Sequence, residues 1–460
     1  MSKQQKKLVV IGGGAAGMSA ATTARRLRPD WQITVLERGS HVSFILCGLP
    51  YFICNTVKDL ESLVVYTPEY FRKERDIDVR IRHEVRRIDS REQVVEALAV
   101  DTREKETLRY DSLVIAAGAN AVRPNIPGIG LRGVFTLRSL ESGVQIKDYL
   151  KTRRVRRAAL IGGGYIGLEM AEAMRTLGLR AAIVEATDSL MPGSEPEIAQ
   201  LIEEEVRRHQ VEVRKQQLAL RFEPDATGAV QRVVTDQGEL PAEIVIVAVG
   251  ASPDASVARE GGVALGETRA IAVDERMRTN VPNIYAAGDC AETRHLITGK
   301  AMYVPLGTTA NKQGRVAGEN AVGGDATFAG VVGSSAVKVF DLEVARTGLS
   351  EEQAKTHGFD AVAATGQFPS RARFYPGAKT VTGKLVAERG SGRLLGAQMA
   401  GNDGGTVAKR LDVAAVALHA GMTVSDLLRL DLNYAPPFAA AFEGIQAVAQ
   451  ALQRRLEREE

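Results

Sequence analysis

Two stretches of the chain share one pattern, and this internal near-repeat constrains the fold more than any other feature. The first, KLVVIGGGAAGMSAATTARRLRPDWQITVLERG, starts at Lys7, and the second, AALIGGGYIGLEMAEAMRTLGLRAAIVEATD, starts at Ala158. Each has an apolar run, a cluster of glycines, an alanine-rich stretch and a second apolar run closed by an acid. The pattern predicts two β-α-β units about 150 residues apart.

The glycines and the acid of each unit have separate roles in binding a dinucleotide. The first glycine of a Gly-x-Gly-x-x-Gly turn permits the tight turn, the second lets a pyrophosphate approach a helix N-terminus, and the third lets helix and strand pack closely. The closing acid accepts hydrogen bonds from a ribose hydroxyl. One such motif is weak evidence, but two complete units predict two sites, and the obvious pair of ligands is a flavin and a nicotinamide. The candidate residues are Gly12, Gly14, Gly17, Glu37 and Arg38 for one site, and Gly162, Gly164, Gly167, Glu169 and Glu185 for the other.

Three further segments support this arrangement, because each places small residues directly after a short apolar run. They are YDSLVIAAGANAVRPNIPG (residues 110–128), EIVIVAVGASPDA (243–255) and TNVPNIYAAGDCAE (279–292). Their turns add the cofactor-binding candidates Ala117, Gly118, Gly250, Gly288 and Asp289. Taken alone, Asp289 also fits a plain turn at the end of a strand.

Composition excludes several other classes of protein. The net charge of +3 gives no sign of a nucleic-acid binder, and three cysteines in 460 residues make no disulfide framework, so a cytoplasmic location is expected. No stretch approaches the ~18 apolar residues of a membrane span. Six histidines without Cys/His pairs at ligand spacing predict no metal site. The expected partners are small molecules, not nucleic acid or a membrane.

The order of these motifs resembles the pyridine-nucleotide disulfide oxidoreductases that bind FAD, over essentially the whole chain. The resemblance implies an α/β fold with two Rossmann-like dinucleotide-binding domains and an α+β C-terminal dimerisation domain. It also implies that Asp289 contacts the ribityl or pyrophosphate region of the flavin. The implied boundaries are residues 1–118 and 255–328 for the FAD domain, 119–254 for the NAD(P) domain and 329–460 for the dimerisation domain.

Glu185 bears on the choice of nicotinamide. An acid at this strand end accepts from a 2′-hydroxyl and repels a 2′-phosphate, which favours NADH over NADPH. Members of the family use either coenzyme, so NADPH stays the alternative.

The segment SFILCGLPY (residues 43–51) carries a single cysteine, Cys47, where familiar members of the superfamily have a Cys-x4-Cys pair. The next cysteine, Cys54, is seven residues on, which in a helix is a rise of about 10.5 Å. A disulfide needs Cα atoms within roughly 7 Å. Cys54 is therefore expected to be a structural thiol, with a resolving role as the less favoured alternative.

The pattern SFxxCGxPY resembles the single-cysteine coenzyme A-disulfide reductases, the persulfide reductases and the related NADH oxidases and peroxidases. The resemblance implies that Cys47 lies beside the flavin and is redox-active, instead of filling a core. Gly48 and Pro50 suit the start of a helix, and a helix N-terminus lowers the pKa of a thiol placed there.

The C-terminal segment LNYAPPFAAAFEG (residues 432–444) resembles the Tyr-Ala-Pro-Pro motif of the coenzyme A-disulfide reductases. The resemblance implies that Tyr434 reaches the cysteine of the other subunit and protonates the leaving thiolate, as a phenol of pKa about 10 does when held close. A second tyrosine is expected from a Tyr-Tyr-Pro-Gly element, but this chain has RFYPGAK. Phe374 therefore replaces the first tyrosine, and Tyr375 is the candidate substitute.

The family's coenzyme A contacts carry over to Ser19, Thr23, Arg26, Ser43 and Asn311. Of these, Arg26 is physically persuasive, because a guanidinium pairs well with the 3′-phosphate or the pyrophosphate of coenzyme A. An ordinary basic helix end that complements the dipole is the equally weighted alternative for Arg26. A basic residue that the family often places after Tyr-Ala-Pro-Pro is missing here.

These observations predict a homodimeric FAD enzyme in which NADH reduces the flavin and the flavin reduces Cys47. Cys47 rests as a mixed disulfide with coenzyme A, and its freed thiolate attacks the next disulfide or persulfide. The alternatives are an NADH oxidase or peroxidase, in which Cys47 cycles through a sulfenic acid, and a flavin-containing redox sensor. The Tyr-Ala-Pro-Pro motif argues against the oxidase, and the complete second dinucleotide unit argues against the sensor.

Overall fold

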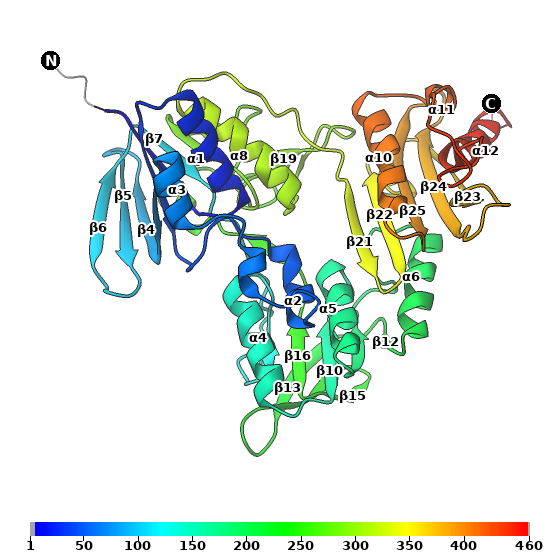
Figure 1. Cartoon of the computed structure of the whole chain (residues 1–460), viewed down its shortest axis with the longest axis horizontal. Coiled ribbons are helices and arrows are strands. Elements are labelled where there is room, and N and C mark those ends of the chain that lie inside the picture. Colours follow the sequence, from blue (N-terminus) through cyan, green and yellow to red (C-terminus); the bar gives the residue numbers. More distant parts are fainter. Residues whose placement is uncertain (1–4, 459–460) are drawn as a thin grey trace.

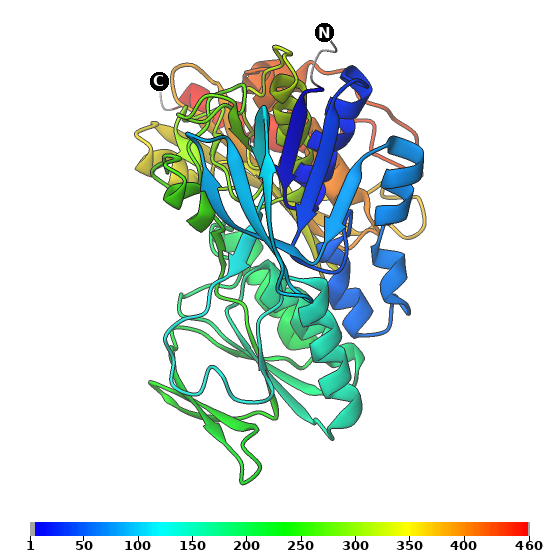
Figure 2. The same ribbon diagram turned by 90° about the vertical axis from the view of Figure 1, so that its left-hand side faces the viewer.

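The computed structural model describes residues 5–458 and shows three units, each built around its own five-stranded sheet. In Figure 1 the N-terminal unit and the C-terminal unit occupy the two upper sides, and the central unit lies below them. Figure 2, turned by 90°, shows the same division, with the central unit projecting downward. Within the described residues, no helix combines the length and the apolar character that a membrane crossing requires.

The N-terminal unit is a parallel sheet covered by packed helices. Its strands are apolar and almost completely buried, as expected of a sheet with both faces covered. Helix α1 (Ala15–Leu27) follows the first strand, and α8 (Gly307–Ala321) packs against α1. The order across the sheet is β18 (Ile284–Ala286), β7 (Ser112–Ile115), β1 (Lys7–Ile11), β2 (Gln32–Glu37) and β3 (Asp78–Ile81).

An antiparallel sheet and short helices complete this unit. The sheet consists of β4 (His83–Asp89), β5 (Val94–Ala99) and β6 (Lys105–Arg109). The remaining elements are α3 (Pro68–Arg75), α7 (Ser256–Glu260), a 3-10 turn at Leu60–Leu63, and the short strands β19 (Thr293–Arg294) and β20 (Ala301–Met302).

The central unit repeats the parallel βαβ plan. Its strand order is β12 (Glu212–Arg214), β11 (Arg180–Val184), β10 (Arg157–Ile161), β16 (Ile244–Val247) and β9 (Val134–Phe135). Its helices are α4 (Leu140–Thr152), α5 (Tyr165–Thr176) and α6 (Pro196–Arg208). A three-stranded antiparallel sheet is attached, formed by β13 (Ala219–Pro224), β14 (Val230–Thr235) and β15 (Gly238–Pro241).

Two antiparallel strands carry the chain into and out of the central unit. They are β8 (Ala119–Ala121) and β17 (Ala251–Pro253), which pair with each other. The central unit is thus inserted between two parts of the N-terminal unit, as the motif order predicts. The assignment of these units to FAD and NAD(P), with the boundaries given above, stays a prediction.

The C-terminal unit is an antiparallel sheet with helices on it. Helix α10 packs on β22 and β25, and α12 packs on β23 and β24. The strand order is β21 (Ser335–Val339), β22 (Leu342–Gly348), β25 (Leu394–Gly401), β24 (Thr380–Glu388) and β23 (Ala361–Pro369). The helices are α9 (Glu351–Thr356), α10 (Thr406–His419), α11 (Val424–Leu428) and α12 (Gly444–Arg458).

The cysteine segment, residues 42–54, leaves the N-terminal unit and packs into the central one. A 3-10 turn (Leu46–Gly48) leads into the short helix α2 (Leu49–Ile53), which lies between α4 and α5 in Figure 1. Close approach is possible because Gly143 of α4 has no side chain: a Cβ there would lie 2.5 Å from Leu49 Cδ2. The buried side chains of α2 join the apolar cluster of the central unit, namely Leu49, Phe52 and Ile53 with Leu160, Leu168 and Met170.

Candidate active site

The two glycine turns have nearly the same geometry. Gly12 and Gly162 have φ angles of +98° and +103°, in the left-handed region that side chains disfavour. A Cβ on Gly17 would lie 1.9 Å from Gly12 O, and a Cβ on Gly167 would lie 1.9 Å from Gly162 O. The first and third glycines of both motifs are therefore required by the backbone, as predicted.

The middle glycines lie differently, because they face open space. A Cβ on Gly14 or on Gly164 would meet nothing within 4 Å. Both residues are the N-caps of long helices, α1 and α5, and as glycines they have no side chain to accept a hydrogen bond from the first turn. Unbonded N–H groups beside free space suit a pyrophosphate. Both turns therefore fit a dinucleotide.

The acids that close the two units are held by backbone N–H groups. Glu37 accepts hydrogen bonds from Gly13 N at 2.7 Å and Gly39 N at 2.6 Å. Burial raises the pKa of Glu37, and these two hydrogen bonds oppose the rise. The following Arg38 pairs with Asp254 at 3.1 Å. Arg38 thereby links β2 to the loop after β17.

Glu185 repeats this arrangement and adds a hydroxyl. It accepts from Gly163 N at 2.6 Å, and from both Thr187 N and Thr187 Oγ1 at 2.8 Å. Glu185 Oε1 accepts both bonds from Thr187, whereas Oε2 accepts only the one from Gly163 N and keeps a second lone pair. Both acids are therefore fixed in place with capacity left for a ribose hydroxyl.

The remaining predicted cofactor residues lie in loops after parallel strands. Gly118 and Gly250 have positive φ angles and flank the paired strands β8 and β17. Gly288 has a φ of +81° and donates its N–H to Gln313 Oε1 at 2.9 Å. Ala117 directly precedes Gly118.

Asp289 forms an ion pair with Arg138, which reaches it from the start of α4. Burial raises the pKa of Asp289, and Arg138 opposes the rise. Beside this pair, two buried atoms have no hydrogen-bond partner in the described part of the chain: Arg138 Nε and Tyr303 Oη. Buried polar atoms are normally bonded, so these orphans fit a polar group of a bound flavin. Arg138 and Tyr303 could not be predicted from local patterns, because their proximity to Asp289 arises only in the fold.

The cysteine segment is anchored on the first glycine turn. Ser43 N donates to Gly13 O at 2.8 Å, and Ser43 itself has a φ of +51°. Cys47 follows four residues later and is exposed. It lies within the 3-10 turn, and the N-cap of α2 is Gly48. The expected helix with Pro50 in its first turn is present, but Cys47 is not at its N-terminus, and α2 has only five residues.

The other two cysteines are buried and unpaired. Cys54 Sγ donates to Tyr51 O at 3.5 Å and lies 3.3 Å from Thr56 Oγ1. Cys290 is fully buried, and burial raises the pKa of its thiol to about 12. No disulfide joins the three cysteines. The prediction that Cys47 and Cys54 do not pair is confirmed.

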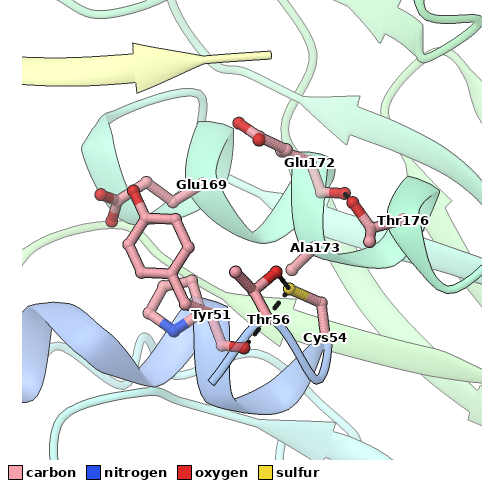
Figure 3. A pocket seen from close by; sticks show the side chains of 8 residues that line it. Tyr51, Cys54, Thr56, Glu169, Glu172, Ala173 and Thr176 are labelled. Carbon is pink, nitrogen blue, oxygen red and sulfur yellow. Dashed lines mark hydrogen bonds between the residues drawn. The ribbon is translucent and has the colours of Figure 1, made fainter. Parts of the chain in front are cut away.

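A small pocket lined partly by polar side chains lies at the contact between α2 and α5 (Figure 3). The Tyr51 ring of α2 lies toward Glu169 of α5, which comes two residues after the last glycine of the second motif. Burial and, to a smaller extent, the charge of Glu172 together raise the pKa of Glu169 to about 7. Glu172 instead binds Phe340 N at 2.8 Å. The pocket therefore holds one carboxyl group that titrates near neutral pH beside the cysteine segment.

Four of the five predicted coenzyme A residues lie on two packed helices, Ser19, Thr23 and Arg26 on α1 and Asn311 on α8, whereas Ser43 lies in the cysteine segment. A Cβ on Gly314 would meet Ala16 O at 2.2 Å, and one on Gly318 would meet Ala20 O at 2.2 Å. The equal steps of four residues show that the helices run in the same direction. Asn311 Nδ2 donates to Ser19 Oγ at 2.8 Å across this contact.

Two arginines of these helices have no ion pair among the described residues. Arg25 pairs with Asp76 and Arg28 with Asp30, whereas Arg26 is exposed and has no ion pair within residues 5–458. One turn after Asn311, Arg315 is likewise exposed without an ion pair in that range. Arg315 could have been predicted from the sequence, because it follows Asn311 by four residues and so lies on the same face of the helix. Thr23 of α1 is buried and Ser43 is half-buried.

The two predicted tyrosine acids lie on neighbouring loops of the C-terminal unit. Ala372 N donates to Pro436 O at 3.1 Å, which ties the loop of Tyr375 to that of Tyr434. Arg410 binds the carbonyls of Ser370 and Phe438 and strengthens this tie. No contact joins either tyrosine to Cys47 within the described part of the chain. The exposed aromatic side chains of these loops are Phe374, Tyr375, Tyr434, Phe438 and Phe442.

One group of potential metal ligands occurs in the described residues, on α6 and the turn before β22. Its members are Glu205, His209 and Asp341, whose ligand atoms lie within 4.8 Å of one another. Arg208 binds Glu205 at 2.7 Å and Asp341 at 2.9 Å. The two carboxylates thus already have a cationic partner.

Two dinucleotide-binding turns beside an exposed thiol define a dinucleotide-dependent oxidoreductase. A family model described as pyridine nucleotide-disulphide oxidoreductase matches residues 6–314, and its dimerisation domain matches residues 334–445. The chain belongs to this family, and the predicted fold class and the cofactors FAD and NAD(P)H are confirmed. A dimerisation domain is present, as predicted.

Individual relatives cover almost the whole chain. An NAD(P)H sulfur oxidoreductase (CoA-dependent) from Pyrococcus abyssi is 40% identical, over 93% of this chain and 94% of the relative. An NADH oxidase from Methanocaldococcus jannaschii is 32% identical, over 95% and 96%. The solved structure of an NAD-dependent persulfide reductase from A. fulgidus is 40% identical with a TM-score of 0.95, over 98% of this chain and 84% of that one.

Proposed function

We propose that the chain is an FAD-dependent NAD(P)H oxidoreductase that reduces coenzyme A disulfide or persulfide, with Cys47 as its one redox cysteine. Cys47 is exposed and lacks a partner thiol, while Cys54 and Cys290 are buried. This single observation carries the proposal, because the sulfur that pairs with Cys47 must then come from an external thiol. The names of the relatives from Pyrococcus abyssi and A. fulgidus agree with such an acceptor.

Each site residue has a role in this reaction. Gly14 and Gly164 admit the pyrophosphates of FAD and the nicotinamide coenzyme, and Glu37 and Glu185 fix their riboses. FAD, when bound, carries two electrons from NAD(P)H to the cysteine. Glu185 favours NADH, and no arginine follows it to hold a 2′-phosphate, since the next residue is Ala186.

The sulfur chemistry takes place at Cys47. Its thiolate attacks one sulfur of coenzyme A disulfide, so a Cys47–coenzyme A disulfide forms and one coenzyme A thiolate leaves. Two electrons then cleave the mixed disulfide, releasing the second coenzyme A and restoring the thiolate. With a persulfide acceptor, the same attack releases sulfide or the coenzyme A thiol, according to which sulfur is attacked.

The contact of α1 and α8 is the proposed binding groove for coenzyme A. A hydrogen bond between Asn311 and Ser19 joins the two helices, and Arg26 and Arg315 offer guanidinium groups that have no ion pair within residues 5–458. Guanidinium pairs strongly with phosphate, and coenzyme A carries three phosphates near its nucleoside. Arg315 therefore joins Ser19, Thr23, Arg26, Ser43 and Asn311 in the proposed site.

The active enzyme is proposed to be a homodimer in the reducing cytoplasm. The aromatic residues of the C-terminal loops, such as Phe374 at 79% and Phe438 at 75% exposure, would leave a large apolar patch in water. A second copy that covers them brings Tyr434 of the partner subunit toward Cys47, where its phenol protonates the departing thiolate. Tyr375 is the nearest candidate to support it, because Phe374 cannot donate a proton.

The direct test is NADH oxidation with four acceptors: coenzyme A disulfide, coenzyme A persulfide, polysulfide and oxygen. We expect one of the coenzyme A acceptors to be turned over fastest. Cys47→Ser should abolish this turnover while NADH still bleaches the flavin, and Tyr434→Phe should slow it about 100-fold, within the usual range for a general acid. Oxygen as the fastest acceptor would support the oxidase instead.

A further inference from the structure

Helix α4 carries a buried charge that the proposed reaction does not use. Lys147 is 5% exposed, and within residues 5–458 it has no carboxylate at ion-pair distance. Burial lowers the pKa of Lys147, with a further contribution from Lys151. Lysine is almost never fully buried unless paired, so the position of Lys147 requires an explanation.

The ammonium group instead binds the segment that carries Cys47. Lys147 Nζ donates to Phe52 O at 2.7 Å and to Lys58 O at 3.3 Å. It also lies 3.7 Å from the centroid of the Phe52 ring. Phe52 is in the last turn of α2, where its carbonyl also accepts from Asn55 N at 3.2 Å and a cation complements the helix dipole. Lys147 therefore fastens the C-terminal end of α2 to the loop that follows it.

The same helix contacts the cofactor side of the site. Arg138, just before α4, pairs with Asp289, and Gly143 of α4 admits Leu49 of α2. One rigid helix thus reaches from the proposed flavin contact to both ends of α2. These contacts fix the distance between the proposed flavin contact and α2, because a helix does not change length.

We propose that Lys147 is a positioning residue, which holds α2 so that Cys47 keeps its place relative to the two dinucleotide sites. The proposal rests on the proposed function for its catalytic meaning. Its physical content, the fixing of α2, is independent of what Cys47 reduces.

The test compares Lys147→Met with Lys151→Met in the FAD-loaded enzyme. Methionine keeps an unbranched side chain over Phe52 but donates no hydrogen bond. Lys151 is one turn further along α4, and its side chain is 65% exposed, so it is the matched control. The first measurements are amide hydrogen exchange of residues 49–54 and the rate at which iodoacetamide alkylates Cys47. The exchange rate and the alkylation rate should each change at least tenfold in Lys147→Met. Neither rate should change in Lys151→Met.

A kinetic measurement separates positioning from folding. In Lys147→Met, NADH should bleach the flavin within twofold of the wild-type rate, while the next step, release of coenzyme A from Cys47, slows at least tenfold. Lys147→Gln, which keeps a donor without the charge, should recover most of that loss. Wild-type exchange, alkylation and release rates in Lys147→Met would overturn the proposal.

Two other outcomes are equally decisive. Loss of FAD from both the Met and the Gln variant would assign Lys147 to folding alone and overturn positioning. Wild-type enzyme without coenzyme A on Cys47 would overturn the proposed function, and the exchange and alkylation rates would then still decide whether Lys147 fixes α2.

Discussion

The two βαβ units are almost identical at their glycine turns and differ in what packs on their helices. Helix α1 is covered by α8, which joins it through Asn311 and Ser19. Helix α5 is covered by α2, the helix that follows Cys47, with a polar pocket at the contact. The repeated backbone therefore accounts for two similar glycine turns, and the unrepeated neighbours distinguish the unit with the proposed coenzyme A groove from the unit against which α2 packs.

The two units also differ in how their predicted ligand sites are bonded to the rest of the chain. The N-terminal site is closed around Asp289 by Arg138 from the central unit, and Arg38 adds a link to Asp254. At the central site, the hydrogen-bond partners of Glu185 among residues 5–458 are Gly163 and Thr187 of its own unit. A resident flavin and a coenzyme that exchanges each turnover suit these respective arrangements.

The largest expected difference between the two units comes from replacing the third glycine of each motif. Gly17→Ala and Gly167→Ala each place a Cβ 1.9 Å from a carbonyl oxygen. Gly17→Ala should purify with at least tenfold less FAD. Gly167→Ala should retain FAD, but NADH should bleach it at least 100-fold more slowly, as stopped-flow absorbance would show. Equal loss of FAD in both variants would mean that the two sites are not independent.

The closing acids should give an intermediate effect. Glu185→Ala removes hydrogen bonds to a charged acceptor, each of about 1.5–3 kcal/mol, so the KM for NADH should rise about 10- to 100-fold. The preference for NADH over NADPH should fall with it. Glu37→Ala is the matched variant and should weaken FAD retention without changing the KM for NADH. An unchanged KM in Glu185→Ala would show that NADH binds elsewhere.

The smallest expected effect is on thermal stability, and it concerns Glu169 in the pocket between α2 and α5. Because the pKa of Glu169 is raised to about 7, the folded state keeps a proton that the unfolded state loses above its ordinary pKa of 4.5. Stability is therefore full below pH 4.5 and falls as the pH rises through 7, by up to about 3 kcal/mol. Glu169→Gln should melt near the wild-type temperature at pH 5 and several degrees higher at pH 8.

Glu172→Gln is the control for this measurement. Glu172 pairs with Lys338 and accepts from Phe340 N, so its replacement should lower the melting temperature at pH 8. If Glu169→Gln melts below the wild type at pH 8, then Glu169 is ionised and has a favourable partner there.

Local patterns in the sequence were sufficient for the βαβ units. The glycine spacing and the closing acids predicted β1 to β2 and β10 to β11, because these contacts lie within about 30 residues of one another. The free state of Cys47 and the proline in the first turn of α2 were also predictable from spacing alone.

Contacts between segments that are far apart in the sequence could not be predicted from such local patterns. Arg138 and Asp289 are 151 residues apart, and Lys147 and Phe52 are 95 apart. Nothing near Cys47 in the sequence indicates that α2 packs into the core of the central unit. The placement of Cys47 in a 3-10 turn was also missed, since helix ends are defined by geometry and Gly48 and Pro50 fit either form.

The central claim is that Cys47 exchanges disulfides with an external thiol instead of a second cysteine. Mass spectrometry of the non-reduced holoenzyme tests it most directly, before and after one equivalent of NADH without oxygen. We expect one coenzyme A bound to Cys47 in each chain, released as the free thiol after NADH is added. A Cys47–Cys54 disulfide, or a sulfenic acid on Cys47 with no coenzyme A, would contradict it.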